Sequence, residues 1–420
     1  MDGIRASRRS ILGRILMNGI KWLESLKGRG IKIGLERMDT LMEKFSPDYR
    51  IVHVGGTNGK GSVCQFVGSI LQEEGFDVGI YSSPHLERLN ERITINGTEI
   101  SDDSLNEIAE MLMEEDMGMT FFEAMTAISL IYFRGKIDFA VIEVGMGGRY
   151  DATNIVNADV TVITNISMEH EKYLGRSIEE IAGEKSGIIK GGSVVTACTG
   201  DALRVIEEKA REQKSEIYVV GRDIKWKRLS PKKFLVEGND IYELQTNLSG
   251  IFQGNNIAVS VKVAEILGIK KRSIVEGIRK ASLPGRMERA GMFLLDGAHN
   301  PAGIEAMGEG LKDFTYRKLF IIFGAMKDKD IESMVKALPE GELIATAVGM
   351  ERAADTEMLS SIIKKAGKTC ICESNVENAI KKAMKMAGSE DLICITGSLY
   401  LVGEARRILK KMGIKFSSPL

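Results

Sequence analysis

The 420-residue chain has almost no net charge, few cysteines and no long apolar run. A net charge of −1 gives no sign of a nucleic-acid or membrane surface, because such surfaces draw on an excess of basic residues. No apolar run reaches the length that a membrane span requires. Hydrophobic residues make up 44% of the chain and charged residues 27%, as in ordinary globular proteins, and the length favours two or three domains.

The five cysteines are an odd and sparse set. Cys370 and Cys372 are separated by one residue within an apolar run, which is more typical of a strand than of a metal pair or a disulfide. We therefore expect a reducing, cytoplasmic environment. Residues 1–16 contain four arginines but lack an apolar core, so they do not resemble a signal peptide. Two interpretations of them stay open: an amphipathic first helix, or a true start at Met17 instead of Met1.

A glycine-rich stretch, Gly55–Ser62 (GGTNGKGS), follows an apolar run over 50–54 and precedes a pattern of helical period. Strand, glycine-rich loop and helix form the layout of a phosphate site, because backbone N–H groups turn toward an anion at the helix N-terminus. Lys60 adds a positive charge. The match to G-x-x-x-x-G-K-[ST] is imperfect, since Val54 and Gly61 replace Gly and Ser/Thr. The alternative is a turn that packs a helix onto a sheet.

Apolar runs and helical patterns alternate along the rest of the chain. Strands are expected near 78–81, 91–97, 138–145, 160–164, 194–197 and 217–220, and the one near 91–97 is expected at a sheet edge, followed by a turn. Helices are expected near 101–115, 120–132, 177–189, 254–267 and 272–281, and residues 177–180 are expected to form a capping box at the start of the third. Residues 222–246 alternate in the manner of a small antiparallel meander. Beyond the hinge-like stretch 284–286, five strand–helix units begin near 292, 319, 343, 369 and 391. We therefore expect an α/β fold, with a P-loop-type central-sheet domain over 1–285 and a smaller, doubly wound parallel, Rossmann-like domain over 286–420.

Two oxygen-bearing side chains are candidate metal ligands. Glu143 ends an apolar strand, at the edge where open α/β sheets bind their ligands, and a nucleoside triphosphate needs Mg²⁺ held by hard oxygens. The alternative is a charge facing solvent. Ser83 is a second candidate oxygen ligand, or else a turn residue before Pro84. Lys185 follows Glu184 on a helix, and its periodicity favours a solvated surface lysine.

The chain has four histidines. His85, His170 and His299 lie in loops, where functional residues concentrate. A lone histidine is more often structural, but the loop placement favours a functional role for His170 and His299. His53 lies within a strand and is interpreted as packing.

Nine motifs in a fixed order resemble a known family. Over nearly its whole length the chain is similar to folylpolyglutamate synthase and bifunctional dihydrofolate synthase, members of the Mur ligase superfamily. One motif alone is a weak signal, whereas nine in family order are specific. The motifs are HVGGTNGKGSV (53–63), SSPHLERLNERITING (82–97), TFFEAMTA (120–127), AVIEVGMGGRYDATN (140–154), ITNISMEHEKYLG (163–175), EKSGIIK (184–190), PGRMER (284–289), DGAHNP (296–301) and GSLYLVGE (397–404).

The resemblance implies an ATP-dependent amide ligase. The substrate carboxylate attacks the γ-phosphate of ATP to form an acyl phosphate, and the amino group of glutamate then displaces phosphate. Such an enzyme holds two anions together, neutralises them and excludes water, and needs no protein nucleophile. The first domain would then be the ATPase domain and the second the glutamate-ligase domain, and catalysis would require closure about the hinge.

The resemblance also implies roles for individual residues. Lys185 matches a family lysine that CO₂ carbamylates, which would make it a metal ligand and requires a neutral amine. Ser83, Glu143, His170 and the carbamate would bind Mg²⁺. Residues that would contact ATP are Thr57, Asn58, Gly59, Lys60, Gly61, Ser62, Asn256, Arg286 and Asp296, with His299 near the phosphates. The family often has a Leu-Asp pair before the histidine; Met168 and Glu169 stand there, and Glu169 keeps the acidic character.

Substrate contacts are predicted on weaker grounds. Phe121 and Phe122 suit stacking on a pterin ring, and their alternative is the core of a helix. Residues expected to bind the pterin or the carboxylates of substrate and glutamate are Glu123, Asp151, Arg92, Arg149 and Ser398.

Several functions compete at this point. The first is addition of L-glutamate to dihydropteroate, to a folate, or to both. The alternatives are a Mur-type ligase for another acid, an ATPase that does not ligate, and an inactive binding protein. The expected partners are small-molecule substrates, without nucleic acid or membrane, and the expected state is a monomer. Which acceptor is used, and how long a glutamate tail is made, stay open.

Overall fold

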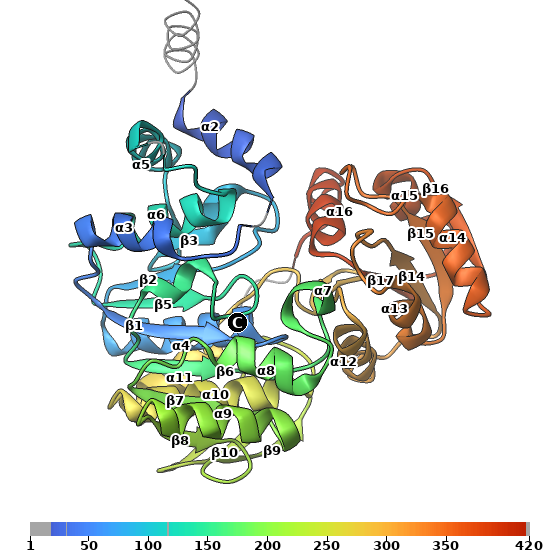
Figure 1. Cartoon of the computed structure of the whole chain (residues 1–420). Helices are drawn as coiled ribbons and strands as arrows, with labels where there is room; N and C mark the ends of the chain where they lie inside the picture. The colour runs from blue at the N-terminus through green and yellow to red at the C-terminus, as the bar shows by residue number, and fades with distance from the viewer. Residues whose placement is uncertain (1–17, 31, 116, 417–420) are drawn as a thin grey trace, which may run out of the picture. The chain divides into compact units, whose positions relative to one another are not determined.

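The computed structural model (Figure 1) describes residues 18–30, 32–115 and 117–416. The chain divides into two compact units. Unit 1 comprises Met1–Gly56, Glu74–His85 and Leu89–Tyr218, and unit 2 comprises Thr57–Glu73, Leu86–Arg88 and Val219–Leu420. The expected first helix, or start at Met17, lies outside the described residues. The boundary expected after residue 285 falls within unit 2 and stays a prediction.

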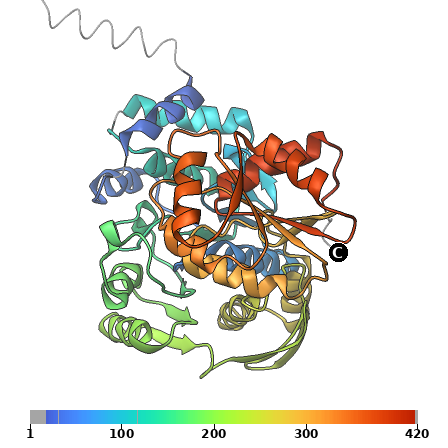
Figure 2. The ribbon, with the colours of Figure 1, turned by 90° about the vertical axis from the view of Figure 1, so that its right-hand side faces the viewer.

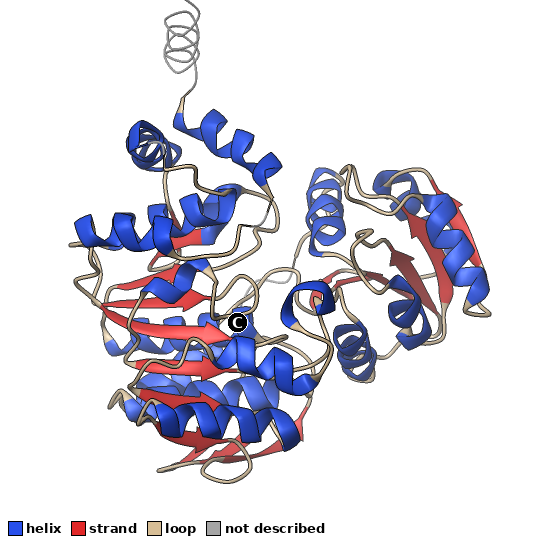
Figure 3. Cartoon of the chain, viewed as in Figure 1, coloured by secondary structure: helices blue, strands red, loops and turns tan. Residues whose placement is uncertain are grey.

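An eight-stranded sheet forms the centre of unit 1, in the order β4-β3-β2-β5-β1-β6-β7-β8 (Figure 3). The β1 strand runs parallel to β5 and β6, β2 runs parallel to β5, and β6 runs parallel to β7, whereas β3 is antiparallel to β2 and β4. The strands are β1 Arg50–Gly55, β2 Val78–Tyr81, β3 Ile93–Ile95, β4 Thr98–Glu99, β5 Phe139–Glu143, β6 Val160–Ile163, β7 Ser193–Thr196 and β8 Glu216–Val219.

Ala140 and Ile142 point to one face of β5, since successive side chains of a strand alternate between its two faces. Ala140 and Ile142 join a core with α2, α3, α5 and α6, and Val144 joins a separate core with α8 and α9. The helices are α2 Gly19–Leu26, η1 Lys27–Arg29, α3 Glu36–Lys44, η2 Leu89–Arg92, α5 Asp102–Glu115, α6 Phe121–Phe133, η3 Ala152–Ile155, α7 Glu171–Leu174, α8 Ile178–Ser186 and α9 Gly200–Glu212.

Unit 2 contains a three-stranded meander, three helices of the central region and a six-stranded sheet. The meander has the order β11-β10-β9 and is antiparallel, as predicted. The six-stranded sheet has the order β12-β13-β17-β14-β15-β16. The three helices are α4 Lys60–Glu74, α10 Gln253–Ile266 and α11 Lys271–Lys280, and the meander is β9 Lys225–Ser230, β10 Lys233–Glu237 and β11 Ile241–Gln245. The strands of the six-stranded sheet are β12 Glu288–Ala290, β13 Phe293–Leu295, β14 Leu319–Phe323, β15 Glu342–Thr346, β16 Cys370–Glu373 and β17 Leu392–Thr396. The helices between and after them are α12 Pro301–Leu311, α13 Ile331–Ala337, α14 Thr356–Lys365, α15 Val376–Met386 and α16 Leu399–Lys411.

The six-stranded sheet is covered on both faces. Ile321 and Phe323 pack with α12, α13 and α14, whereas Phe320 and Ile322 pack with α15 and α16. Figure 2 shows these strands, coloured orange to red, running between their helices. The strands β13 to β17 are parallel, so the doubly wound parallel domain is confirmed. The sequence analysis missed β12, which runs antiparallel to β13.

Three local predictions need correction. The strand expected over 91–97 is only β3, because residues 89–92 form the 3₁₀ helix η2, and β3 is not the edge since β4 pairs outside it. The helix expected to reach 189 ends at Ser186, where Gly187 caps it. The Ser177 side chain does cap α8, but Glu180 accepts a hydrogen bond from the backbone of Arg176, 2.6 Å away.

Among the residues that the structure describes, no helix combines the length and apolarity that crossing a membrane would need.

His53 sits at the centre of β1 and agrees with its interpretation as packing. Its side chain is fully buried, and its Nε2 lies 2.8 Å from the hydroxyl oxygen of Thr153. Burial, reinforced by the charge of Lys190, lowers the pKa of His53 from 6.5 to about 3. The imidazole is therefore neutral in the fold at any pH above that value.

We predict that His53→Gln reduces the acid sensitivity of unit 1. Below pH 6.5 the unfolded chain binds a proton at His53 and the folded chain does not, so stability falls as the pH falls. Between pH 7 and pH 5 this group alone costs about 2 kcal/mol in the wild type and nothing in the variant. Urea unfolding, followed by Trp22 fluorescence in a Trp226→Phe background, measures the difference. Equal losses in both proteins would contradict the assignment.

Candidate active site

Four neighbouring parallel strands of unit 1 end at one edge of the sheet. The order β2-β5-β1-β6 pairs Tyr81 with Ile142, Val54 with Glu143, and Gly55 with Ile163. The loops that leave these strands therefore start side by side, as ligand-binding loops of open α/β sheets do. Glu143 is the last residue of β5, and Ser83, Gly56 and the loop of His170 follow the ends of β2, β1 and β6.

The structure brings Glu143 and Ser83 together, two residues predicted as metal ligands. The backbone N–H of Ser83 donates to Oε2 of Glu143 at 3.2 Å. Glu143 is only 6% exposed, so the alternative of a carboxylate facing solvent is wrong. A buried carboxylate next to the backbone of a serine offers two kinds of hard oxygen ligand for a divalent cation, the carboxylate and the serine hydroxyl.

Lys185 is buried, so its interpretation as a surface lysine is wrong. The residue is 2% exposed, and its Nζ lies 2.7 Å from Oε1 of Glu169 and 3.1 Å from the carbonyl oxygen of Gly56. Glu169 is a residue that sequence reasoning did not place in the site. The signal was available, because an acidic residue beside a loop histidine matched an acidic position of the family.

His170 adopts an unusual backbone conformation at the start of α7. Its φ of 49° lies in the left-handed region, which side chains other than glycine rarely occupy. Such strain costs of order 1–3 kcal/mol and concentrates at functional sites, so it supports a role for this residue. His170 directly follows Glu169, the partner of Lys185.

The donor set of unit 1 fits a hard divalent cation. Glu143 and Ser83 offer oxygens and His170 an imidazole nitrogen, a combination that Mg²⁺ and Mn²⁺ accept. Within residues 18–30, 32–115 and 117–416, no three His, Cys, Asp or Glu side chains gather as a metal-binding group. Mg²⁺ is usually held by one or two carboxylates together with substrate phosphates, and the pair of Glu143 and Ser83 suits that arrangement.

Two positions in the glycine-rich stretch Gly55–Ser62, called the phosphate loop below, accept only glycine because of their surroundings. Gly56 has φ 132°, and a Cβ atom there would lie 2.0 Å from the hydroxyl oxygen of Thr164. Gly59 has φ 88°, and its Cβ atom would lie 2.4 Å from Oδ1 of Asn256. The loop therefore packs its bare backbone against these polar side chains, and larger residues are excluded.

In unit 2 the phosphate loop leads directly into α4, which begins at Lys60. The Lys60 Nζ donates to the carbonyl oxygen of Thr57 at 3.1 Å. Gln253 connects Ser62 to Asn256, because its amide donates to the Ser62 hydroxyl at 3.4 Å and accepts from Asn256 at 2.8 Å. Gln253 was missed by sequence reasoning, although it lies three residues before Asn256.

A pair of amides joins the phosphate loop to α12. Asn300 donates to Oδ1 of Asn58 at 3.1 Å, and Asn58 donates back at 3.4 Å. Asn300 is also the N-cap of α12 and accepts from the backbone of Gly303 at 2.7 Å. Sequence reasoning gave Asn300 no role, although it lies in the DGAHNP motif.

Positive charges surround His299 in unit 2. Its Nδ1–H donates to the carbonyl oxygen of Gly297 at 2.8 Å, which leaves Nε2 as an acceptor. Burial, and then the charges of Arg286, Lys329 and Lys60, lower the pKa of His299 to about 4. A neutral imidazole among three cations is a favourable setting for an anion such as phosphate.

Asp296 holds the segment that carries Arg286. Its carboxylate accepts from the backbone N–H groups of Met287 and Ala298, each at 2.9 Å. Burial raises the pKa of Asp296, and the charge of Arg286 opposes that rise. The structure thus brings together Arg286, Asp296 and His299, three of the residues expected at ATP.

The two phenylalanines predicted to stack on a pterin ring have different neighbours. Phe121 has cations over its ring, with Lys27 Nζ 5.5 Å and Arg92 Cζ 5.3 Å from the centroid. Arg92 also donates to Nδ1 of His85 at 2.9 Å. Phe122 packs against Tyr81 with centroids 6.1 Å apart, so both phenylalanines already have neighbours in unit 1.

The remaining predicted substrate residues have local structural partners. The Glu123 carboxylate closes a capping box with Thr120 and pairs with Arg37 at 2.8 Å. Asp151 caps η3 and accepts from the backbone of Met146 at 2.9 Å. Burial raises the pKa of Asp151, with Thr153 opposing the rise.

Arg149 and Ser398 complete the predicted set. Arg149 Nε lies 3.5 Å from Oε1 of Glu184, and about half of its side chain is exposed. Ser398 is the N-cap of α16 and accepts from the backbone of Tyr400 at 3.2 Å. Their roles toward a substrate stay predictions.

Comparison with known proteins finds two matching family models, and the first of them spans parts of both units. Residues 54–264 match the Mur ligase middle domain, and residues 285–399 match the Mur ligase glutamate ligase domain. A curated relative is dihydrofolate synthase/folylpolyglutamate synthase of Bacillus subtilis, 36% identical over 93% of this chain and 98% of its own.

Two solved structures have the same fold. Escherichia coli FolC in complex with DHPP and ADP has a TM-score of 0.87 and 27% identity, over 95% of this chain and 99% of that chain. A bifunctional folylpolyglutamate synthase/dihydrofolate synthase with Mn, AMPPNP and L-glutamate bound has a TM-score of 0.85 and 29% identity, over 94% and 98% of the two chains. With the ordered motifs and the two matching domains, these likenesses show that the chain belongs to the folylpolyglutamate synthase/dihydrofolate synthase family of ATP-dependent Mur ligases.

Proposed function

We propose that this protein is an ATP-dependent amide ligase that joins L-glutamate to dihydropteroate, to folyl-(poly)glutamate, or to both, and releases ADP and phosphate. The observation that carries the proposal is the edge of the unit 1 sheet. There β1 runs into the glycine-rich loop while its neighbour β5 ends in Glu143, paired in register with Val54. Similar proteins bind ADP with DHPP, or AMPPNP with Mn and L-glutamate.

The residues support two chemical steps. A carboxylate oxygen of the acceptor attacks the γ-phosphorus of ATP, the bond to ADP breaks, and an acyl phosphate forms. The amine of glutamate then attacks the acyl carbon, loses a proton to solvent, and expels phosphate as the amide forms. Because ATP activates the carboxyl group, the protein needs to position reactants and stabilise charge.

Each residue group has a proposed part. Backbone N–H groups of Thr57–Ser62 and the ammonium of Lys60 would hold the phosphates, together with Arg286 and neutral His299. Glu143, Ser83 and His170 would hold Mg²⁺, which would supply positive charge against the phosphates. Asn256 and Asp296 would contact ATP. The substrate roles of Phe121, Phe122, Glu123, Asp151, Arg92, Arg149 and Ser398 remain part of this proposal.

We further propose that Lys185 becomes carbamylated and joins the metal ligands. Support comes from its burial and from its position beside Gly56 of the phosphate loop. Its ammonium, now paired with Glu169, must first lose a proton, because only the neutral amine reacts with CO₂.

The proposed setting is a cytoplasmic monomer with small-molecule substrates and no nucleic-acid or membrane partner. Support comes from the net charge of −1 and from the free state of the cysteines, none of which forms a disulfide in the part of the chain that the structure describes. The two-domain boundary after residue 285 belongs to the same proposal.

A substrate panel tests the proposed reaction. ADP release is expected only when ATP and Mg²⁺ are supplied with both glutamate and a pterin acid, because the acyl phosphate needs both reactants to turn over. The panel comprises dihydropteroate, tetrahydrofolate and their monoglutamates. Release of ADP without glutamate and without an acceptor would instead indicate an ATPase.

Glu143→Gln is expected to raise the Mg²⁺ concentration for half-maximal activity by about tenfold or more, because the amide has no charge to offer the cation. Binding of Mn²⁺ in the presence of ADP should weaken in parallel. Glu179→Gln, at an exposed glutamate in the first turn of α8, serves as the matched control. An unchanged metal requirement in Glu143→Gln would remove this residue from the metal site.

Protein equilibrated with ¹³C-bicarbonate should show a carbamate carbon signal that Lys185→Met lacks. Depletion of CO₂ should lower the activity of the wild type, while Lys21→Met, at an exposed lysine of α2, keeps both the signal and the activity. If the signal persists in Lys185→Met, the carbamate lies elsewhere.

A further inference from the structure

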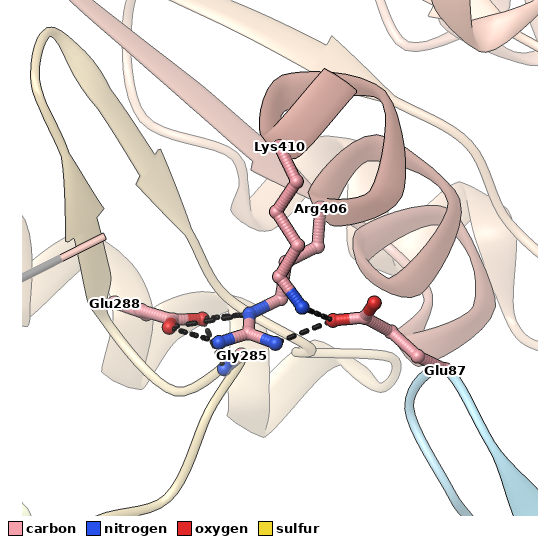
Figure 4. Close-up of polar contacts among 5 residues, drawn as sticks. All are labelled: Glu87, Gly285, Glu288, Arg406 and Lys410. Atoms are coloured by element: carbon pink, nitrogen blue, oxygen red, sulfur yellow. Dashed lines mark hydrogen bonds and ion pairs between the residues drawn. The ribbon is translucent and has the colours of Figure 1, made fainter. Parts of the chain in front are cut away.

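Arg406, on α16, lies between two glutamates from distant segments of unit 2 (Figure 4). Its Nε and Nη2 each lie 2.9 Å from an oxygen of Glu288, in a bidentate pair. Its Nη1 contacts Oε1 of Glu87, and Lys410 Nζ lies 2.7 Å from the same oxygen. Glu288 also accepts from the backbone N–H of Gly285 at 2.8 Å. One guanidinium therefore joins the segments 86–88 and 285–288.

This network is largely withdrawn from water. The side chains of Glu87, Glu288 and Arg406 are 12%, 12% and 15% exposed, so their attraction is screened less than that of surface pairs. Burial alone would raise the pKa of Glu87, but hydrogen bonds from Lys410 and Arg406 outweigh it and lower the pKa. Removal of Arg406 would take the bidentate partner from Glu288 and one cationic contact, beside that of Lys410, from Glu87.

A second contact fixes the same short segment independently of charge. Leu86 packs against the core formed by β13, β14, β17, α15 and α16. A Cβ atom at Gly403 would lie 1.9 Å from the carbonyl oxygen of Leu86, so the backbone of the segment rests directly on α16. A Cβ atom at Gly285 would lie 3.2 Å from the Leu86 side chain. The apolar and ionic contacts thus hold segments 86–88 and 285–288 to one helix.

We propose that Arg406 is a positioning residue for the ligase reaction, through the two segments that it joins. Glu87 comes four residues after Ser83, and Glu288 comes two residues after Arg286. The guanidinium limits the freedom of both segments, and so of a proposed metal ligand and a proposed phosphate contact. The proposed function assigns Arg406 itself no contact with substrate or metal. The inference rests on the proposed function, which assigns Ser83 and Arg286 their roles.

Substitution of Glu87 and of Glu288 separates the effect on the proposed metal ligand Ser83 from the effect on the proposed phosphate contact Arg286. Glu87→Gln should raise the Mg²⁺ requirement about fivefold and leave the KM for ATP within about twofold of the wild type. Glu288→Gln should raise the KM for ATP about fivefold and leave the Mg²⁺ requirement unchanged. Arg406→Lys keeps the charge but loses the bidentate geometry, so it should show both changes. Arg407→Lys, at the exposed neighbour on α16, is the matched control.

Calorimetric titration of each protein with ADP, and with Mn²⁺ in the presence of ADP, gives a readout that does not depend on turnover. The proposal is overturned if the binding constants of Glu87→Gln and Glu288→Gln equal those of Arg407→Lys. It is equally overturned if kcat and the thermal midpoint fall together while both constants stay unchanged, which a merely structural role predicts. Should Arg406→Lys not fold, the two glutamate variants decide. Absence of glutamate ligation in the wild type would count against the proposed function, whereas these titrations would still decide the role of Arg406.

Discussion

Parallel pairing of β1 with β5 on one side and β6 on the other is the constraint on which the candidate site depends. The carbonyl oxygens of Val54 and Gly55 accept hydrogen bonds from the backbone N–H groups of Val144 and Thr164, so β1, β5 and β6 end at the same level of the sheet. A shift of the register by one residue would turn every side chain of β1 to the opposite face, and buried His53 would face the other way. Glu143 lies opposite Val54, one residue before the glycine-rich stretch begins, because this register is fixed.

Local patterns in the sequence predicted the elements well, because period-two and period-3.6 apolar spacing depends on near neighbours. They failed where distant contacts decide. Lys185 follows Glu184 on a helix and has the pattern of a surface residue, yet Glu169 and Gly56 enclose it. The role of β4 as the sheet edge was likewise invisible, since two exposed residues, Thr98 and Glu99, carry no apolar signal.

Motifs in the sequence predicted which residues belong to the candidate site, but not which side chains or backbone groups each of them contacts. The glycines before Lys60, and the position of Glu143 at the end of an apolar strand, were enough to predict these two residues as members of the site. Glu123 and Asp151 show the limit of that reasoning, since each carboxylate also caps a helical element of unit 1. Substitution of either residue would disturb the local backbone as well as any ligand, and loss of activity alone would not separate these effects.

The buried ion pair of Lys185 and Glu169 has a consequence for the local electric field. As an ammonium and a carboxylate the two side chains sum to zero. Addition of CO₂ to the amine, as proposed, replaces the cation by an anion and brings the sum to minus two, without any change of sequence. The negative charge at Lys185 and Glu169 would then attract a divalent cation and repel an anion that carries no metal. The concentration of dissolved CO₂ would therefore set the affinity of this sheet edge for cations.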